Sequence, residues 1–358
     1  MTLDRYTATV LSGNLRKTAL FHTRAHSEDR EQLRYSTFMT NRRNTGYRQA
    51  PFFLVGCPRS GTTLLRCMLD SHRRLAVPPE SHFIARLAPR NARSPFDIEQ
   101  ILGHPQIRTW DIDAAAVRDA VVRRQAATFA EQVDALFGLY ATARGKQRWG
   151  DKTPDYVEHI PKIAAIFPDA LFIHLIRDGR DVATSLAQWP WGPASPVAGT
   201  FWWRRKVTRG RRDGAALPAD RYLELRLEDL VADPEGELRR LCAFLGEAFD
   251  PAMLDYHLTA EERMCEPQET FMAFTHPHLT KPPTAGLRNW RAALTTAEQE
   301  AIEAVCAPLL RELGYPTSPV PRWSAIRAYR LRYASALRAL PRDVRARLRP
   351  WTGLCVRP

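Results

Sequence analysis

Short apolar runs alternate with stretches of helical periodicity along this chain, and the alternation predicts its fold. Residues 51–56 (PFFLVG), 170–176 (ALFIHLI) and 222–230 (YLELRLEDL) are apolar runs that predict three buried strands. Periodic stretches predict helices over residues 62–71, 111–143, 154–167, 233–246 and 295–313, and a turn followed by a helix over 177–189. Strands that alternate with helices favour an α/β fold, in which a parallel sheet carries helices on both faces.

The chain divides into three parts by composition. Residues 1–48 are polar with no strong period and predict a helical N-terminal arm, whereas residues 49–318 hold the predicted α/β domain. Residues 319–358 form an arginine-rich C-terminal tail. Within the domain, the Pro-rich stretches 190–196 and 276–286 predict loops long enough to act as lids or substrate walls.

The net charge of +13 is unevenly distributed. From Arg322 to the end there are ten arginines, one aspartate and no lysine, a net +9, which leaves only +4 for all preceding residues. A nearly balanced body with a basic tail favours a small-molecule enzyme with an appendage over a nucleic-acid-binding protein. The tail alternates arginine with Leu, Tyr and Ala at helical spacing, which fits either a membrane-surface helix or a solvated terminal helix.

The N-terminal residues contain no apolar signal-peptide core, and no run of eighteen apolar residues occurs in the chain. The six cysteines are scattered without a CxxC pair or metal-ligand spacing. These observations predict a cytoplasmic protein with reduced thiols, with association to a membrane as a further hypothesis.

A Gly-rich turn follows the first predicted strand, in the sequence LVGCPRSGTT at residues 54–63. Backbone N–H groups of such a turn bind a phosphate at the start of a helix, and Gly56 and Gly61 let the chain curl close to it. The NTPase form of this loop is G-x-x-x-x-G-K-[ST], but here Thr62 stands in the lysine position and Arg59 is the loop's cation. The sequence therefore predicts a P-loop-like site whose ligand carries less charge than a nucleoside triphosphate with magnesium.

Two later stretches carry residue types suited to a second phosphate and to a nucleotide. In HLIRDGRDVATS, Arg177 ends a predicted strand and Ser185 lies about two turns into the next helix, so the two could grip a phosphate. The alternative is that Arg177 pairs with Asp178 or Asp181. In TKPPTAGLRNWRAALT, a glycine beside cations and a tryptophan suits a flap over a nucleotide, although Trp290 could equally be a core anchor.

Four stretches in order resemble the motifs of sulfotransferases that use 3′-phosphoadenosine 5′-phosphosulfate (PAPS). LVGCPRSGTTLLRCMLDSH looks like their 5′-phosphosulfate loop, and IRDGRDVATS looks like their 3′-phosphate motif. LRLEDLVADPEGELRRLCAFLG resembles their Y-E-D-L…D-P…F-L-G segment, with Leu227 where tyrosine is common, and GLRNWRAALT resembles the element that closes over the nucleotide. With Arg59 in the loop, Glu80 in VPPESHF and Lys152 in GDKTPDY, the chain is most similar to the branch containing protein-tyrosine sulfotransferases and bacterial sulfotransferases.

The resemblance implies a single sulfotransferase domain over residues 49–318, with PAPS as the sulfuryl donor, 3′-phosphoadenosine 5′-phosphate (PAP) as the product, and no metal. It implies that the loop holds the 5′-phosphosulfate and that a strand-end arginine and a helix-borne serine hold the 3′-phosphate. The implied nucleotide-binding residues are Pro58, Arg59, Ser60, Gly61, Thr62, Thr63, Arg177, Ser185, Arg288, Trp290 and Arg291.

The resemblance also implies catalytic roles. Arg59 and Lys152 would stabilise charge on the departing phosphate, and Glu80 would be the general base. A carboxylate works best as a base if burial raises its pKa toward neutrality. His82 is the rival base, since in an extended segment it would share a face with Glu80. For Lys152, the alternative is a solvated lysine paired with Asp151 or Asp155.

The implied acceptor is a hydroxyl group, an alcohol or phenol on a small molecule, a glycan, a lipid or a peptide tyrosine, and not a nucleic acid. A homodimer and a peripheral membrane contact through the tail are further partner hypotheses. Two alternative functions stay open: a P-loop kinase-like phosphotransferase, and a polyanion- or membrane-binding protein that acts through its basic tail.

Overall fold

The computed structural model describes residues 50–189, 192–258, 279–283, 289–321 and 323–339. The predicted arm over residues 1–48 lies outside these ranges, as do Arg288, most of the Pro-rich stretch 276–286 and the end of the tail. All of the described residues belong to one compact unit that begins at Ala50.

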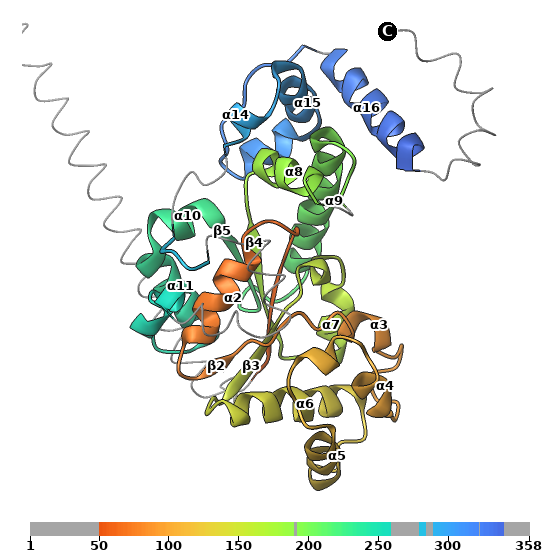
Figure 1. Ribbon diagram of the computed structural model, residues 1–358, viewed down its shortest axis with the longest axis vertical. Coiled ribbons are helices and arrows are strands. Elements are labelled where there is room, and N and C mark those ends of the chain that lie inside the picture. Colours follow the sequence, from red (N-terminus) through yellow and green to blue (C-terminus); the bar gives the residue numbers. More distant parts are fainter. Residues whose placement is uncertain (1–49, 190–191, 259–278, 284–288, 322, 340–358) are drawn as a thin grey trace, which may run out of the picture. The chain divides into compact units, whose positions relative to one another are not determined.

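A five-stranded sheet in the order β2-β3-β1-β4-β5 forms the centre of the fold, and every neighbouring pair of strands is parallel (Figure 1). The strands are β1 (Phe52–Gly56), β2 (Leu75–Ala76), β3 (Arg148–Lys152), β4 (Leu171–Ile176) and β5 (Tyr222–Arg226). β1 and β4 lie inside the sheet and are buried along their whole length, which explains why their sequences are continuous apolar runs.

Helices cover both faces of the sheet, because alternate strand residues point to opposite sides. Phe52 and Leu54 of β1 pack with residues of α2 and α11, whereas Phe53 and Val55 pack with residues of α6 and α7. The predicted fold class is therefore confirmed. The helices that pack against β1 are α2 (Thr62–Ser71), α6 (Phe129–Ala143), α7 (Ile160–Ile166) and α11 (Pro234–Leu245).

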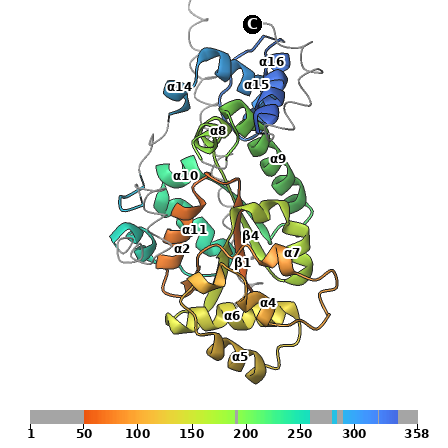
Figure 2. The same ribbon diagram turned by 45° about the vertical axis from the view of Figure 1, so that its right-hand side comes forward.

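A third apolar cluster brings together α8, α9, α14, α15 and α16, and Figure 2 shows these helices grouped at one end of the fold. Their bounds are α8 (Gly179–Ala187), α9 (Pro196–Ala215), α14 (Trp290–Ala293), α15 (Thr296–Glu312) and α16 (Trp323–Ala339). The remaining helical segments are α3 (Ile84–Leu87), α4 (Glu99–Leu102), η2 (Ile107–Thr109), α5 (Ala114–Arg123), η3 (Pro154–Glu158), α10 (Leu227–Ala232) and η4 (Pro251–Met253).

The pairing register explains where a site can form. Gly56, at the end of β1, pairs with Leu175 near the end of β4, so the loops that leave the two strands emerge beside each other. In parallel sheets, ligands bind where loops leave the carboxyl ends of neighbouring strands. The two motifs predicted to hold phosphates, far apart in sequence, thus lie at the same edge of the sheet.

The strand predictions need three corrections, and the first is that the two-residue strand β2 was not predicted. The third predicted strand, 222–230, ends at Arg226, because α10 begins at Leu227 with two acidic residues in its first turn. The strand β3, with the sequence RWGDK, was not predicted, since three of its five residues are charged. All five are nevertheless buried, and such a strand carries no apolar pattern by which a sequence could indicate it.

The helix predictions are largely confirmed, although one was divided and others, such as the short α3 and α4, were missed. α15 begins after a capping box formed by Thr295 and Glu298, as predicted. The helix predicted over 154–167 is divided into η3 and α7. The twenty-residue helix α9 was not predicted, because it begins within the Pro-rich stretch that was predicted to be a loop. Ser195 caps this helix, and Pro196 occupies its first turn.

Candidate active site

The loop between β1 and α2 has the geometry of an anion site. Arg59 and Gly61 both adopt left-handed backbone conformations, with φ of 74° and 92°, which curl the chain in front of the helix. The first N–H groups of α2 have no acceptor within the helix and therefore suit a negatively charged ligand. Any side chain at Gly61 would also meet Leu227, since a Cβ there would lie 2.7 Å from that side chain.

Ser60 provides a separate indication that this loop binds a ligand. Its hydroxyl is buried, and among the described residues its oxygen has no hydrogen-bond partner. A buried polar atom without a partner costs about 1–3 kcal/mol, so native proteins rarely keep one without a reason. A phosphate oxygen seated on the loop would satisfy it, and the loop residues therefore fit the predicted 5′-phosphosulfate.

Arg59, Arg177 and Ser185 come together at this loop, although their motifs are far apart in the sequence. Arg59 Nε donates to Ser185 Oγ at 3.0 Å, and the Arg59 guanidinium lies 5.4 Å from the centre of the Trp189 ring. Arg177 donates to the carbonyl oxygen of Arg59 at 3.4 Å. The helix that the sequence did not predict supports this arrangement, because Trp203 Nε1 on α9 donates to the carbonyl oxygen of Arg177 at 3.1 Å.

The alternative partners of Arg177 are only partly engaged. Arg177 lies 3.6 Å from Asp181, a longer separation than a good hydrogen-bonded ion pair has. Asp178 is held instead by Arg180, at 2.7 Å. The Asp181 carboxylate also accepts a hydrogen bond from the backbone N–H of Trp290 at 2.9 Å. Arg177 therefore lies in the turn without forming a strong ion pair with either aspartate.

Glu80 and Lys152 form the centre of the predicted catalytic group. Lys152 Nζ lies 2.5 Å from Glu80 Oε1 and 3.5 Å from the Thr63 hydroxyl, next to the phosphate loop. The lysine side chain is 1% exposed, whereas the glutamate side chain is 30% exposed and can meet a substrate. Lys152 therefore pairs with neither Asp151 nor Asp155.

A pKa near neutrality would suit a general base best, but the pKa of Glu80 is lowered in this structure. Burial does oppose ionisation, but Lys152 and the hydrogen bond with His82 outweigh it and lower the pKa of Glu80 to about 2. One carboxylate lies between two basic groups, so it stays ionised throughout the ordinary pH range. The pKa of Glu80 is low because its carboxylate makes a short contact with the buried Lys152.

His82, the rival base, lies against Glu80 rather than apart from it. Its Nε2 is 2.9 Å from Glu80 Oε2, on a residue whose backbone φ is 52°. The hydrogen bond to Glu80 raises the pKa of His82 against the opposing effect of burial. A histidine with a raised pKa keeps its proton over more of the ordinary pH range, so it could remove a proton from an acceptor only above that pKa.

A buried polar network that the sequence did not indicate lies behind these residues. The Ser81 hydroxyl donates to Asp151 and lies 2.8 Å from the Tyr156 hydroxyl, while Thr153 donates to Asp151 at 2.9 Å. Burial raises the pKa of Asp151 to about 6. Because Ser81 stands between Glu80 and His82 in the chain, the network fixes the backbone that carries both.

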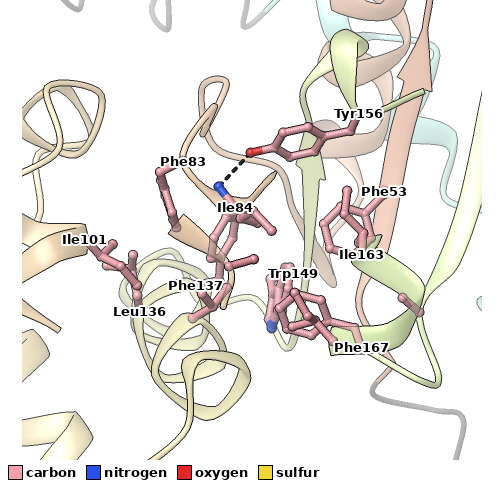
Figure 3. Packing of buried hydrophobic residues seen from close by; sticks show 14 of the residues in the cluster. Phe53, Phe83, Ile84, Ile101, Leu136, Phe137, Trp149, Tyr156, Ile163 and Phe167 are labelled. Carbon is pink, nitrogen blue, oxygen red and sulfur yellow. Dashed lines mark hydrogen bonds between the residues drawn. The ribbon is translucent and has the colours of Figure 1, made fainter. Parts of the chain in front are cut away.

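An aromatic core packs next to this network, and Tyr156 belongs to both. Figure 3 shows Tyr156 reaching the backbone N–H of Ile84, a hydrogen bond of 2.9 Å, above the packed rings of the cluster. Trp149 of β3 lies among them, with its ring centre 4.4 Å from that of Phe137. The tight packing of this cluster limits movement of the segment around Ser81.

The closing element is described only in part. Trp290 is buried in the third apolar cluster, and its ring centre lies 4.1 Å from the guanidinium group of Arg180 and 4.4 Å from that of Arg291. The structure thus places Trp290 in the core, one of the two positions open to it. Its contact with the nucleotide, and that of Arg291, stay predictions, and Arg288 lies outside the described residues.

Within the described ranges, no group of three His, Cys, Asp or Glu side chains could hold a metal ion. The prediction that the reaction needs no metal stays a prediction. Cys57, beside the loop, is buried, and burial raises the pKa of its thiol to about 12. It therefore packs inward, as expected, and is unsuited to act as a nucleophile.

Comparison with known proteins gives one family. Residues 51–251 match the family described as "Sulfotransferase family". "Nodulation protein NoeE" of Sinorhizobium fredii strain NBRC 101917 / NGR234 is 29% identical over 291 residues, which cover 74% of this chain and 66% of that protein. "Protein-tyrosine sulfotransferase A" of Caenorhabditis elegans is 25% identical over 318 residues, 84% of this chain and 77% of that protein.

A solved structure is similar in fold. It is the "Sulfotransferase Domain from the Synechococcus PCC 7002 Olefin Synthase", with a TM-score of 0.53 and 24% sequence identity, over 75% of this chain and 97% of that one. At this identity the likeness concerns the fold alone. It supports the parallel sheet and the loop-to-helix connection described above.

Proposed function

This chain belongs to the sulfotransferase family, and on that premise we propose that it moves the sulfuryl group of PAPS to a hydroxyl acceptor. The observation that carries the proposal is the junction of the phosphate loop with Lys152 and Glu80. A buried loop hydroxyl without a partner among the described residues, the nearby Arg59 and Arg177, and Lys152, which pairs with Glu80 and lies 3.5 Å from the Thr63 hydroxyl, support a donor site with a base beside it.

The proposed reaction is an in-line displacement at sulfur. An acceptor oxygen attacks the sulfur, the new O–S bond forms, and the bond between sulfur and the phosphate oxygen breaks. The proton of the acceptor passes to Glu80, and the electron pair of the broken bond leaves with PAP. Positioning and charge stabilisation supply most of the rate in such transfers, as they do in phosphoryl transfer.

The residues of this chain would divide the work. The loop N–H groups, Ser60 and Arg59 would hold the 5′-phosphosulfate, and Arg177 with Ser185 would hold the 3′-phosphate. Lys152 would stabilise the charge that develops on the departing oxygen. When Lys152 turns toward that oxygen, its hold on Glu80 weakens, and the carboxylate becomes a stronger base at the moment when one is needed.

The acceptor is proposed only as a class. Two similar proteins, from Caenorhabditis elegans and Danio rerio, are called protein-tyrosine sulfotransferases, a name that specifies a phenol acceptor. For this chain we propose a hydroxyl, an alcohol or a phenol, because a single carboxylate base serves either. The acceptor walls of such folds are loops, and loop residues give no general code for the acceptor.

The test is titration calorimetry of the purified chain with PAP and, separately, with ATP, each with and without magnesium. We expect PAP to bind without metal and more tightly than ATP, because Thr62 stands where a nucleoside-triphosphate loop has its lysine. Arg59→Ala should weaken PAP binding by roughly tenfold or more, the cost of one charge-assisted contact.

The matched control is Arg239→Ala, an exposed arginine on α11 that pairs with Glu235 and has no contact with the loop. It should leave PAP binding unchanged. Magnesium-dependent binding and hydrolysis of ATP, with no binding of PAP, would contradict the proposal and favour the kinase-like alternative.

A further inference from the structure

Bulky apolar side chains are exposed together on α9 and α16. Among the described residues, seven large apolar side chains are exposed, and five of these belong to the two helices. They are Trp202, Trp323, Ile326, Tyr329 and Leu331. Scattered single exposed residues are ordinary, but a concentration on one pair of helices indicates an interaction surface.

The two helices form one surface because they are in contact. The rings of Phe201 on α9 and Tyr329 on α16 lie 5.2 Å apart, and the Arg332 guanidinium lies 4.6 Å from the Phe201 ring. Ser324 and Ala328, one helical turn apart, form the buried side of α16. The opposite side of α16 therefore faces outward. By helical spacing it carries Trp323, Ile326, Arg327 and Arg330, at positions i, i+3, i+4 and i+7.

The charge of this surface has one sign. α16 contains four arginines and no acidic residue over its seventeen residues. A hollow of about 1210 Å³ lies beside it, lined by Trp202, Arg204, Arg205, Arg209, Arg212 and Arg332 among others, and no carboxylate of the described residues lines it. Neighbouring carboxylates offset part of the charge, since Arg205 pairs with Glu158 at 3.2 Å and Arg212 with Asp213 at 2.7 Å.

We propose that the α9–α16 surface, the outward sides of these two helices, binds an anionic membrane. Trp and Tyr prefer the headgroup level of a bilayer, Ile and Leu enter its apolar boundary, and arginine binds the phosphate of anionic lipids while its stem lies along apolar surface. No described helix is long and apolar enough to cross a membrane, so the contact is a peripheral one.

An anionic membrane explains the surface better than a soluble acidic polymer does. A polyanion would select the arginines alone, because exposed Ile and Leu gain nothing from a sulfated or carboxylated chain. Ile326 is 65% exposed and Trp323 is 54% exposed, next to two arginines, and only a partner with both an apolar layer and negative charge satisfies both kinds of side chain. The surface also extends beyond the tail, since α9 supplies Trp202 and four of the arginines.

The experiment is cosedimentation of the full chain with vesicles of phosphatidylcholine alone and with vesicles containing about one third phosphatidylserine. We expect binding to the anionic vesicles only, weakened by salt, because the screening length falls from about 10 Å at 0.1 M to about 3 Å at 1 M. Ile326→Ser/Arg327→Glu should weaken the partition coefficient by about tenfold or more. Trp202→Ser should weaken it by roughly threefold, which tests the share of α9.

The chain offers a closely matched control. Val122 is 74% exposed and is followed by the exposed Arg123 on α5, a helix that packs against α6. Val122→Ser/Arg123→Glu makes the same chemical change at the same spacing and should leave vesicle binding unaltered. Circular dichroism and the thermal midpoint, within about 2 °C of the parent, show that each variant is folded.

Three outcomes would overturn the proposal. The first is equal binding to both kinds of vesicle or to neither. The second is an equal loss in the α5 control, which would make the effect one of net charge. The third is salt-sensitive binding to heparin without binding to vesicles, which would assign the surface to an acidic polymer. Because vesicle binding needs no nucleotide, these results are independent of PAP binding.

Discussion

One carboxylate between two basic groups defines the site at the scale of residues. Glu80 contacts Lys152 and His82 through different oxygens, at 2.5 Å and 2.9 Å. The lysine is buried, so water does not screen its charge from the glutamate. Lys152 and His82 together outweigh the effect of burial and lower the pKa of Glu80 to about 2. The base is thus kept ionised, and its strength depends on where Lys152 points.

The pH dependence of kcat/KM can distinguish the two candidate bases, because that ratio reports ionisations of the free enzyme. With Glu80 as the base, the carboxylate is already ionised above about pH 3, and kcat/KM for sulfuryl transfer should stay level down to about pH 5. With His82 as the base, the rate should fall as the pH drops through the raised pKa of His82. The measurement is transfer from labelled PAPS to a phenol.

Two variants sharpen that comparison. Glu80→Gln should lose turnover by about a hundredfold or more while PAP binding remains. His82→Asn should retain most of the turnover and shift any acid limb upward, since the pKa of Glu80 rises when its second partner is removed. Normal turnover in Glu80→Gln would exclude Glu80 as the base.

At the scale of elements, a buried arginine joins three helices beside the site. Arg180 on α8 is 1% exposed, donates to Asp178 and to Glu303 of α15, and lies 4.1 Å from the ring of Trp290 on α14. It also donates to the carbonyl oxygen of Pro316 at 2.8 Å. This side chain therefore helps to fix the position of α8, which carries Ser185.

Removal of that arginine should be strongly destabilising. Arg180→Met leaves Asp178 and Glu303 buried without their cation, and we expect the free energy of unfolding to fall by about 3–5 kcal/mol. Urea denaturation measures it. Arg239→Ala, which removes an exposed ion pair on α11, should change stability by less than about 1 kcal/mol. A loss no larger than that of the control would show that Arg180 is not the link between these helices.

At the scale of the whole molecule, buried ionisable groups make stability depend on pH. Burial raises the pKa of Asp151 from its ordinary value of 3.8 to about 6, so its protonated form is favoured in the folded state. Its contribution to stability is complete below about pH 4 and is lost as the pH rises through about 6. Glu80 acts in the opposite sense, since its contribution is lost only as the pH falls from 4.5 toward 2.

The difference in unfolding free energy between the parent and Asp151→Asn isolates the aspartate from the other groups. From about pH 4 to about pH 7, the parent should lose on the order of 3 kcal/mol relative to the variant, because two pKa units correspond to about that energy. Urea midpoints across the range measure it. Asp119→Asn, an exposed change on α5, should show no such trend. A difference independent of pH would contradict the raised pKa.

The sequence by itself determined the central part of this protein. The apolar runs of β1 and β4, the loop between β1 and α2, and the capped helices arise from local patterns, since burial on both sides demands continuous apolar residues and turns demand glycine. Arg59 lies in a phosphate-binding turn with a local signature, whereas Glu80 and Lys152 were indicated by the resemblance to the family motifs.

Only the tertiary structure decided what lies between those parts. β3 is charged and yet buried, α9 begins inside a predicted loop, and the Ser81–Asp151–Tyr156 network joins Ser81 to residues 70 and 75 positions further along the chain. The low pKa of Glu80 likewise depends on a lysine that another strand brings within 2.5 Å. Charge interactions act through space, so no local pattern in the chain records their sign or strength.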